Sequence, residues 1–225
     1  MFVHKVKINV DGKDILCDSD KTVLEVATEN DIYIPTLCYI PLISDSRKGR
    51  CRLCLVEVLS GGRLGLQSSC TLPVSEGLTV TTNNENVFNV RRLIVELILS
   101  EHKIDCRNCV VSGQCNIAKL CEEYDIDALP VCAECPNQKN GCLLNKGKFC
   151  LGPITYGGCN AKCLREGFAC EGCHGVSECE SLLIWGIKQY RDTNISFEEV
   201  IKGAQIFSFK NLKLLRDIMF SEITL

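Results

Sequence analysis

Eight cysteines fall within the 42 residues from Cys132 to Cys173, and this density most constrains how the chain can fold. Glycines and prolines are interleaved with them, including Gly152-Pro153 and Gly157-Gly158, and hydrophobic periodicity is weak. We therefore expect no ordinary hydrophobic core in this segment, so that metal coordination would have to supply the folding free energy. Eight thiolates suit two sites with four ligands each.

The whole chain has 18 cysteines in 225 residues, which either a disulfide scaffold or metal–thiolate ligation could explain. The first residues, MFVHKVKINV, lack the apolar run and the small-residue cleavage site of a signal peptide. Thiols stay reduced in a protein that is not exported, so we expect metal ligation in a cytoplasmic protein. No stretch approaches the roughly 20 apolar residues of a membrane span. A formal charge of −3 without a basic tract argues against nucleic-acid binding.

The first 82 residues predict a small α+β domain. Phe2–Val10 alternates between polar and apolar residues as a strand does, and Asp11-Gly12 is a hairpin turn signal before a second strand. Thr22–Asn30 has helical spacing, with Ser19 or Asp20 able to cap its start. Strand, turn, strand and helix in this order open a β-grasp fold.

Four cysteines of this domain have the spacing C-x12-C-x2-C-x15-C: Cys38, Cys51, Cys54 and Cys70. The sequences GRCRLCLVEV (49–58) and SCTLPVSEGLTVTT (69–82) resemble the N-terminal domain of the large iron–sulfur subunit of NADH:quinone oxidoreductase (complex I). The same domain occurs in the diaphorase parts of soluble hydrogenases. The resemblance implies a [2Fe–2S] cluster on these four cysteines. Tetrahedral zinc is the alternative that the residue types leave open. Cys17 lies apart from this set and is interpreted as a core thiol.

A helix and a second ligand set follow. The helix is predicted over Asn86–Leu99, with one buried apolar stripe: Val87, Val90, Leu93, Ile94, Leu97 and Ile98. The spacing H-x3-C-x2-C-x5-C then places one imidazole and three thiols in a loop: His102, Cys106, Cys109 and Cys115. Imidazole and thiolate ligands suit iron or zinc equally well. The complex I family has the same element in the same order, which implies a [4Fe–4S] cluster here. Cys121 is interpreted as helix packing.

The eight-cysteine segment supplies the remaining candidate ligands: Cys132, Cys135, Cys142, Cys150, Cys159, Cys163, Cys170 and Cys173. The sequence CLLNKGKFCLGPITYGGCNAKCLREGFACEGCHG (142–175) resembles the C-terminal part of the small subunit of cytosolic [NiFe] hydrogenases. That resemblance implies two [4Fe–4S] clusters on its six cysteines, with Cys132 and Cys135 completing the eight by count. Spacing alone does not partition the eight between two clusters. Cys179 could replace one of them.

The last 45 residues predict helices over Leu182–Tyr190, Phe197–Phe207 and Asn211–Phe220, with Ser196 and Glu199 forming a capping box. We expect these helices to pack over the metal sites, to dock on a partner, or both. The predicted α+β chain thus has a β-grasp [2Fe–2S] ferredoxin-like domain (1–82), a helical [4Fe–4S] linker domain (83–128), an irregular two-cluster segment (129–180) and a helical tail (181–225).

The predicted function is that of an iron–sulfur electron-transfer subunit which makes no bonds itself, because no nucleophile–base constellation and no GxGxxG element is present. Its expected cofactors are one [2Fe–2S] and three [4Fe–4S] clusters. The resemblance implies that FMN and NAD(P) lie on a partner similar to the complex I flavoprotein subunit, with a further redox or catalytic subunit beside it.

The resemblance further points to an electron-bifurcating hydrogenase, a formate dehydrogenase or a transhydrogenase of an anaerobe. Two other functions remain open from the sequence. One is a zinc-stabilised adaptor without a redox role, and the other is a free-standing ferredoxin-like carrier.

Overall fold

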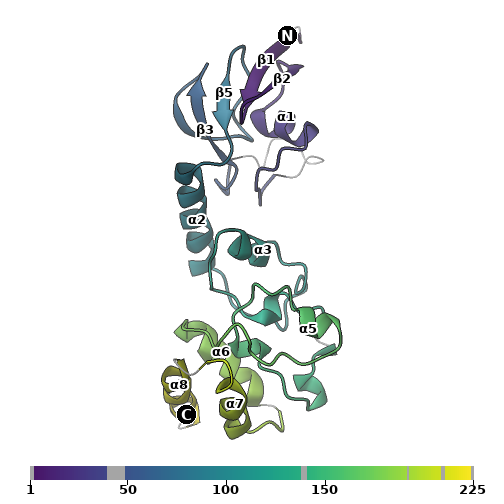
Figure 1. Ribbon diagram of the computed structural model, residues 1–225, viewed down its shortest axis with the longest axis vertical. Coiled ribbons are helices and arrows are strands. Elements are labelled where there is room, and N and C mark those ends of the chain that lie inside the picture. Colours follow the sequence, from purple (N-terminus) through teal and green to yellow (C-terminus); the bar gives the residue numbers. More distant parts are fainter. Residues whose placement is uncertain (1–2, 40–48, 138–140, 192, 209–210, 224–225) are drawn as a thin grey trace. The chain divides into compact units, whose positions relative to one another are not determined.

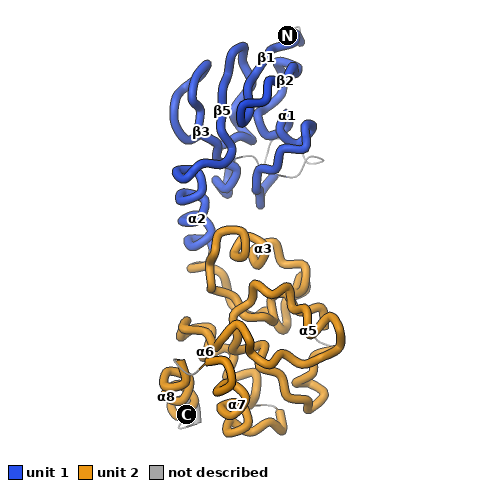
Figure 2. Tube along the Cα trace, viewed as in Figure 1, with its two compact units in different colours: residues 1–98 blue, residues 99–225 orange. Residues whose placement is uncertain are grey.

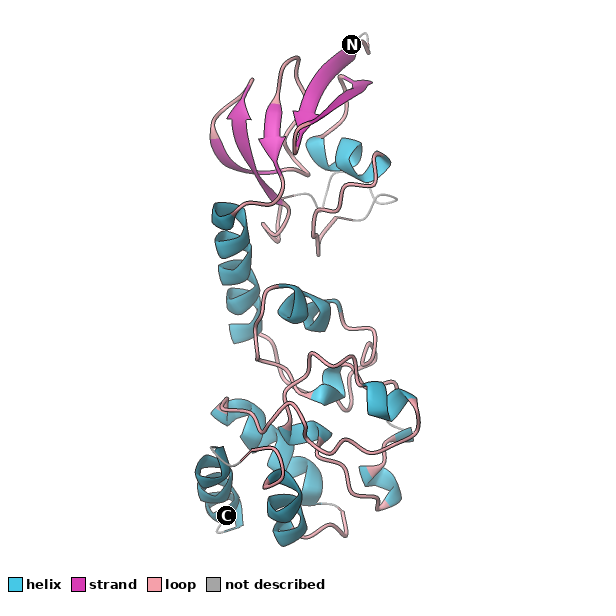
Figure 3. Cartoon of the chain, viewed as in Figure 1, coloured by secondary structure: helices cyan, strands magenta, loops and turns pink. Residues whose placement is uncertain are grey.

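The computed structural model describes residues 3–39, 49–137, 141–191, 193–208 and 211–223. The chain divides into two compact units, Met1–Ile98 and Leu99–Leu225, coloured separately in Figure 2. Within the described residues all the named strands lie in the first unit, whereas the second combines helices with long loops (Figure 3). The His/Cys stretch therefore shares a unit with the eight-cysteine segment. The boundaries at residues 82, 128 and 180 remain predictions.

The first unit contains a five-stranded mixed sheet (Figure 1). Its strands lie in the order β2-β1-β5-β3-β4, with β1 antiparallel to β2 and parallel to β5. The sequence did not predict β4, a four-residue strand without alternating hydrophobic residues. The bounds of the strands are Lys5–Val10 (β1), Lys13–Asp18 (β2), Leu55–Ser60 (β3), Gly65–Ser68 (β4) and Thr79–Thr81 (β5).

The turn between β1 and β2 is the predicted Asp11-Gly12 hairpin, with φ of 53° and 84° at these two residues. Two successive positive φ angles are those of a type I′ turn, whose twist matches that of the flanking strands. The Asp11 carboxylate also accepts a hydrogen bond from the Thr82 N–H at 2.7 Å. The turn thereby fastens the hairpin to the end of β5.

Helix α1, Val23–Glu29, packs its buried residues into the apolar core of the first unit. Its N-cap is Thr22, which forms a capping box with Glu25, so the predicted caps Ser19 and Asp20 are wrong. The reason is that Thr22 has an extended backbone and a hydroxyl within reach of the Glu25 N–H, at 3.4 Å.

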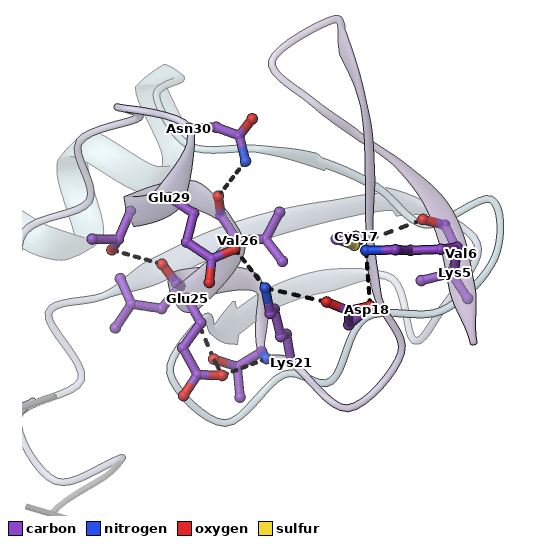
Figure 4. A network of polar contacts seen from close by, with 12 residues as sticks. Lys5, Val6, Cys17, Asp18, Lys21, Glu25, Val26, Glu29 and Asn30 are labelled. Atoms are coloured by element: carbon purple, nitrogen blue, oxygen red, sulfur yellow. Dashed lines mark hydrogen bonds and ion pairs between the residues drawn. The ribbon is translucent and has the colours of Figure 1, made fainter. Parts of the chain in front are cut away.

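Cys17 lies in the same core, as predicted for a thiol outside the ligand set. Its thiol donates a weak hydrogen bond to Val6 O at 3.7 Å (Figure 4). On the solvent side, Lys21 bridges Asp18 and Glu29 with N–O distances of 3.5 and 2.7 Å.

Helix α2, Glu85–Ser100, forms where predicted but buries a different face. Its buried residues are Val87, Arg91 and Val95, whereas Leu93 and Leu97 of the predicted stripe are 62% and 69% exposed. The guanidinium of Arg91 donates to Leu55 O at the start of β3. Pairing this buried cation with a strand carbonyl rotates the helix, a polar interaction that a hydrophobic pattern does not reveal.

The second unit begins with the His/Cys loop and α3 and ends with three packed helices. Between them the eight-cysteine segment runs as loops with short turns of 3-10 helix. The α-helices are Asn116–Glu123 (α3), Lys162–Arg165 (α5), Glu180–Arg191 (α6), Phe197–Ala204 (α7) and Leu212–Ile223 (α8). The 3-10 turns are Val131–Ala133 (η2), Leu144–Lys146 (η3) and Gly152–Ile154 (η4). The predicted capping box at Ser196 and Glu199 is present.

The expectation that this segment lacks a core is wrong. Leu151 and Ile154 from the cysteine-rich loops are buried in one apolar cluster with Leu183, Ile187 and Leu215 of the tail helices. The sequence pattern does not reveal this core, because the loop residues that contribute to it are not spaced as in a helix or a strand. The tail helices contribute the regularly spaced apolar residues of the core, so the segment and the tail fold as one body.

The two parts pack closely at Gly186 of α6, which lies against η4. A Cβ at this position would be only 2.5 Å from Pro153 O and 2.8 Å from Ile154 Cγ2. One turn further on, the buried Tyr190 donates from its Oη to Cys150 O at 2.8 Å. These two contacts hold α6 against the loop that carries Cys150.

A Gly186→Val substitution is expected to destabilise the protein, because the new side chain would meet a backbone oxygen that cannot move independently. The expected loss in free energy of unfolding is about 1–3 kcal/mol, the usual cost of overpacking. Urea denaturation of the full chain under anaerobic conditions measures it. Ser181→Val, on the exposed face of the same helix, carries the same β-branched side chain and should lose much less. An equal loss in both variants would contradict the packing argument.

Candidate metal centres

The first four-cysteine set is assembled by the loop before β3 and the turn after β4. Its sulfurs form two pairs: Cys54 Sγ lies 3.3 Å from Cys70 Sγ, and the Cys38 thiol hydrogen-bonds to that of Cys51. Cys54 and Cys70 are buried, whereas Cys38 and Cys51 are partly accessible. A [2Fe–2S] cluster takes two protein ligands on each of its irons, so two adjacent sulfur pairs suit it.

Backbone N–H groups point at the sulfurs of this set. The Gly49 N–H donates to Cys70 Sγ at 3.2 Å, and the Cys51 N–H donates to Cys38 Sγ at 3.4 Å. Gly49 has φ +75°, a conformation that favours glycine. Hydrogen bonds of this kind stabilise negative charge on sulfur and tune the potential of a cluster.

The pKa values of two thiols of this set are shifted in opposite directions. Burial, followed by the hydrogen bond and charge of the neighbouring Cys54, raises the pKa of Cys70 to about 12. At Cys51 burial acts in the same direction, but backbone hydrogen bonds from Leu53 and Leu37 outweigh it and lower the pKa. A buried thiol of high pKa becomes a thiolate only when a metal compensates its charge.

The His/Cys set surrounds a cavity of about 190 Å³ in the second unit. All four predicted ligands line it: His102, Cys106, Cys109 and Cys115. Burial, followed by the charges of Cys115 and Cys109, raises the pKa of Cys106 to about 12. The structure thus places the imidazole and the three thiols of this spacing around one cavity.

Cys121 is buried on α3 and lines a different cavity, with Leu129 and His174. Burial raises its pKa to about 12, with the Cys115 charge second. This position agrees with its interpretation as a packing residue. Cys179 lines a third cavity with His102 and Trp185, and its sulfur lies 3.2 Å from Ser181 Oγ. It stays a possible substitute ligand.

The eight-cysteine segment separates into two neighbourhoods. The first contains Cys132, Cys135, Cys142 and Cys150, whose thiols influence one another: burial raises the pKa of Cys132 well above its ordinary value, and Cys150 and Cys135 add to the effect. Burial likewise raises the pKa of Cys135 to about 11. A Cβ at Gly152 would lie 3.5 Å from the sulfurs of both Cys132 and Cys150, so the two thiols approach the same stretch of backbone.

The second neighbourhood contains Cys159, Cys170 and Cys173. Burial raises the pKa of Cys159, and the thiol of Cys173 is among the groups that act on it. Burial raises the pKa of Cys170 to about 12, with Cys150 and then Cys159 adding to it, so Cys170 lies between the two neighbourhoods. Cys163, the last of the eight, lies on the short helix α5 and is exposed.

Hydrogen bonds connect the His/Cys loop to the first neighbourhood. Ser112 Oγ donates to Cys132 O at 2.6 Å, and the Gly113 N–H donates to Ala133 O at 2.9 Å. Cys106 also belongs to the groups that raise the pKa of Cys132, after burial, Cys150 and Cys135. The His/Cys loop therefore lies against the loop that carries Cys132 and Cys135.

Three further polar residues organise these loops, and no sequence pattern indicated them. Arg107 donates from Nη1 to Gln189 O at 3.2 Å, which ties the His/Cys loop to the end of α6. Arg165 donates to Asn160 O and, from Nη2, to the main-chain oxygens of Gly113 and Glu134. The Glu134 carboxylate accepts a hydrogen bond from the Ala161 N–H at 3.1 Å.

Two of the donor sets agree with iron–sulfur clusters. All eighteen cysteines are free thiols. Among the described residues, no group of three or more His, Cys, Asp or Glu side chains is arranged to hold one metal ion. Zinc would draw its ligands to about 2.0–2.3 Å from a single centre, whereas a cluster spreads them over several irons. The paired sulfurs of the first set and the wide cavity at His102 agree with the second arrangement.

Comparison with known families identifies the N-terminal part of the chain. Residues 4–85 match the 2Fe-2S iron-sulfur cluster binding domain, and residues 91–129 match the NADH-ubiquinone oxidoreductase-G iron-sulfur binding region. The chain carries both iron–sulfur regions. The resemblance to complex I and to hydrogenase diaphorase subunits is thereby confirmed for this part. The resemblance of residues 142–175 to [NiFe] hydrogenase small subunits stays a prediction.

Relatives of these regions occur in NAD(P)-linked hydrogenases. The chain is 40% identical over 126 residues to the NADP-reducing hydrogenase subunit HndD of Solidesulfovibrio fructosivorans, covering 55% of this chain and 21% of the relative. It is 34% identical over 121 residues to the NAD-reducing hydrogenase HoxS subunit gamma of Cupriavidus necator, covering 54% and 49%. A solved NAD+-reducing [NiFe]-hydrogenase in the H2-reduced state matches with 33% identity and a TM-score of 0.50, covering 55% and 50%.

The chain spans half of the length of these relatives or less. In the part of the chain that the structure describes, no helix has the length and hydropathy needed to cross a membrane.

Proposed function

We propose that this chain is the iron–sulfur electron-transfer subunit of a multi-subunit NAD(P)-linked oxidoreductase. The observation that carries the proposal is that the His/Cys loop lies against the loop of Cys132 and Cys135, to which it is joined by the Ser112–Cys132 hydrogen bond of 2.6 Å. The relatives, named as subunits of NAD- and NADP-reducing hydrogenases, support the same class of function.

The proposed cofactors are one [2Fe–2S] and three [4Fe–4S] clusters. The [2Fe–2S] cluster is assigned to a β-grasp domain, which the sheet order and the parallel pairing of β1 with β5 support. Bound clusters would supply one-electron carriers, and the chain's own residues hold them, exclude water and donate N–H groups to their sulfurs. The proposed ligands are Cys38, Cys51, Cys54 and Cys70 for [2Fe–2S], and His102, Cys106, Cys109 and Cys115 for the first [4Fe–4S].

We further propose a partition of the last eight cysteines. One [4Fe–4S] cluster is assigned to the Cys132 set, which is Cys132, Cys135, Cys142 and Cys150. The other is assigned to the Cys159 set, which is Cys159, Cys163, Cys170 and Cys173. Mutual pKa effects among the thiols and the shared approach to Gly152 support the first group. The Cys132 set would then be the middle cluster of three.

The partners belong to the same proposal. FMN and NAD(P) are assigned to a flavoprotein subunit similar to that of complex I, and a further redox or catalytic subunit would complete the assembly. The finer assignment to an electron-bifurcating hydrogenase, a formate dehydrogenase or a transhydrogenase of an anaerobe rests on the sequence resemblance alone. So does the cytoplasmic location.

Metal analysis of the anaerobically purified full chain tests the proposal. One [2Fe–2S] and three [4Fe–4S] clusters require about 14 iron atoms and as much acid-labile sulfide per chain, and a brown protein. A colourless protein that contains zinc without iron or sulfide would instead establish the zinc-stabilised adaptor.

Paired alanine substitutions test the partition. Cys142→Ala and Cys150→Ala should each remove the same cluster, so that their double variant loses about four irons, no more than either single variant. Cys142→Ala combined with Cys163→Ala should lose about eight. Cys121→Ala is the matched control, a buried cysteine expected to leave the iron content unchanged. Equal losses in the two double variants would contradict the partition.

A His102→Cys substitution is expected to lower the potential of one [4Fe–4S] cluster. Replacing a neutral imidazole by a thiolate adds one negative charge to the site, the reverse of the effect of histidine in Rieske centres. A redox titration followed by electron paramagnetic resonance measures the change. His4→Cys, at an exposed position of the first unit, should leave every potential as it is. A His102→Cys protein with full iron content and an unchanged potential would refute the charge argument.

A further inference from the structure

Glu134 stands between two proposed ligands of the Cys132 set, yet its carboxylate faces the Cys159 set. Oε1 accepts a hydrogen bond from the Gly158 N–H, and Oε2 accepts one from the Ala161 N–H at 3.1 Å. These two donors flank Cys159, and the Cys159 sulfur lies 3.9 Å from Oε2. The carboxylate is therefore fixed beside one sulfur of the neighbouring set.

The backbone around this carboxylate leaves room for it. A Cβ at Gly157 would lie 2.6 Å from Glu134 Oε1, so a side chain there would displace the carboxylate. Gly158 has φ +95°, which turns the chain around the carboxylate in a conformation that favours glycine. Arg165 fixes the backbone of Glu134, because its Nη2 donates a hydrogen bond to the Glu134 main-chain oxygen at 3.3 Å.

Two consequences of this geometry act in the same direction. When the Cys159 thiol binds iron it loses its proton, and the contact with Oε2 becomes one between two negative groups. A reduced cluster carries one more negative charge than an oxidised one, so a nearby anion opposes reduction. The carboxylate and the Cys159 sulfur also share the Ala161 N–H as a hydrogen-bond donor. Without the carboxylate this N–H would be fully available to the sulfur. Fewer donors to sulfur again disfavour the reduced state.

We propose that Glu134 is a potential-tuning residue, whose carboxylate lowers the reduction potential of the cluster on the Cys159 set. The proposal rests on the proposed function, in which that set holds a [4Fe–4S] cluster. Since Glu134 belongs to the loop that carries Cys132 and Cys135, its hydrogen bonds also tie that loop to the loop of Cys159.

Redox titration of the full chain, followed by electron paramagnetic resonance, tests this role. The signal to follow is the one that Cys163→Ala removes. Glu134→Gln keeps the size of the side chain and removes its charge, and it should raise the midpoint potential of that signal at unchanged iron content. Glu134→Asp keeps the charge, and its midpoint potential should stay closer to that of the unmodified protein.

The matched control is Glu171→Gln. Glu171 lies between Cys170 and Cys173 in the same set but is exposed, so solvent screens its charge and the midpoint should shift less. An unchanged midpoint in Glu134→Gln, or a shift no larger than that of Glu171→Gln, would overturn the proposal.

A second variant covers the case in which Glu134→Gln loses iron. Gly157→Ala keeps the Glu134 carboxylate but displaces it from its position beside Cys159. This variant should therefore also raise the midpoint potential of the signal. With iron retained, an unchanged midpoint in this variant would refute the tuning role. A protein that binds no iron in its unmodified form would refute the proposed function itself, which separates the two failures.

Discussion

The second unit depends on the hydrogen bonds that join the His/Cys loop to the loop of Cys132 and Cys135. Ser112 donates to Cys132 O, and the Gly113 N–H donates to Ala133 O. Gly113 has φ +80°, and a Cβ there would lie 2.9 Å from Cys135 O, so only glycine permits this approach. These bonds hold two ligand loops at a fixed separation through the backbone, independently of the flexible thiols.

In the same unit, the tail helices provide a hydrophobic core for the eight-cysteine segment, which has little hydrophobic periodicity of its own. The tail helices bury Leu151 and Ile154 of the loops, and Tyr190 satisfies the carbonyl of Cys150 inside the core. Burial also raises the pKa of the Cys132 thiol well above its ordinary value. Apolar packing and the proposed cluster would therefore support each other, since buried thiolates form only when a metal compensates their charge.

Local elements were predictable because each depends on residues close in sequence. The hairpin at Asp11-Gly12 depends on adjacent residues, and the capping box at Ser196 on residues three positions apart. The failures at α2 and in the core of the second unit share a physical cause, which is a polar or packing contact between distant parts. Arg91 turns α2 by pairing with a carbonyl of β3, and Gly186 admits η4 to the surface of α6. No periodic pattern records either contact.

By itself the sequence determined which thiols and which imidazole could serve as ligands, because ligand spacing and the flanking residues are local properties. It also determined that the chain begins with two iron–sulfur regions of the complex I type. Only the tertiary structure decided that the His/Cys loop lies against the Cys132 loop. It alone placed the Glu134 carboxylate beside Cys159, 25 positions further along the chain. The reason is that these relations depend on loop backbones whose course is set by hydrogen bonds and close glycine contacts between distant segments.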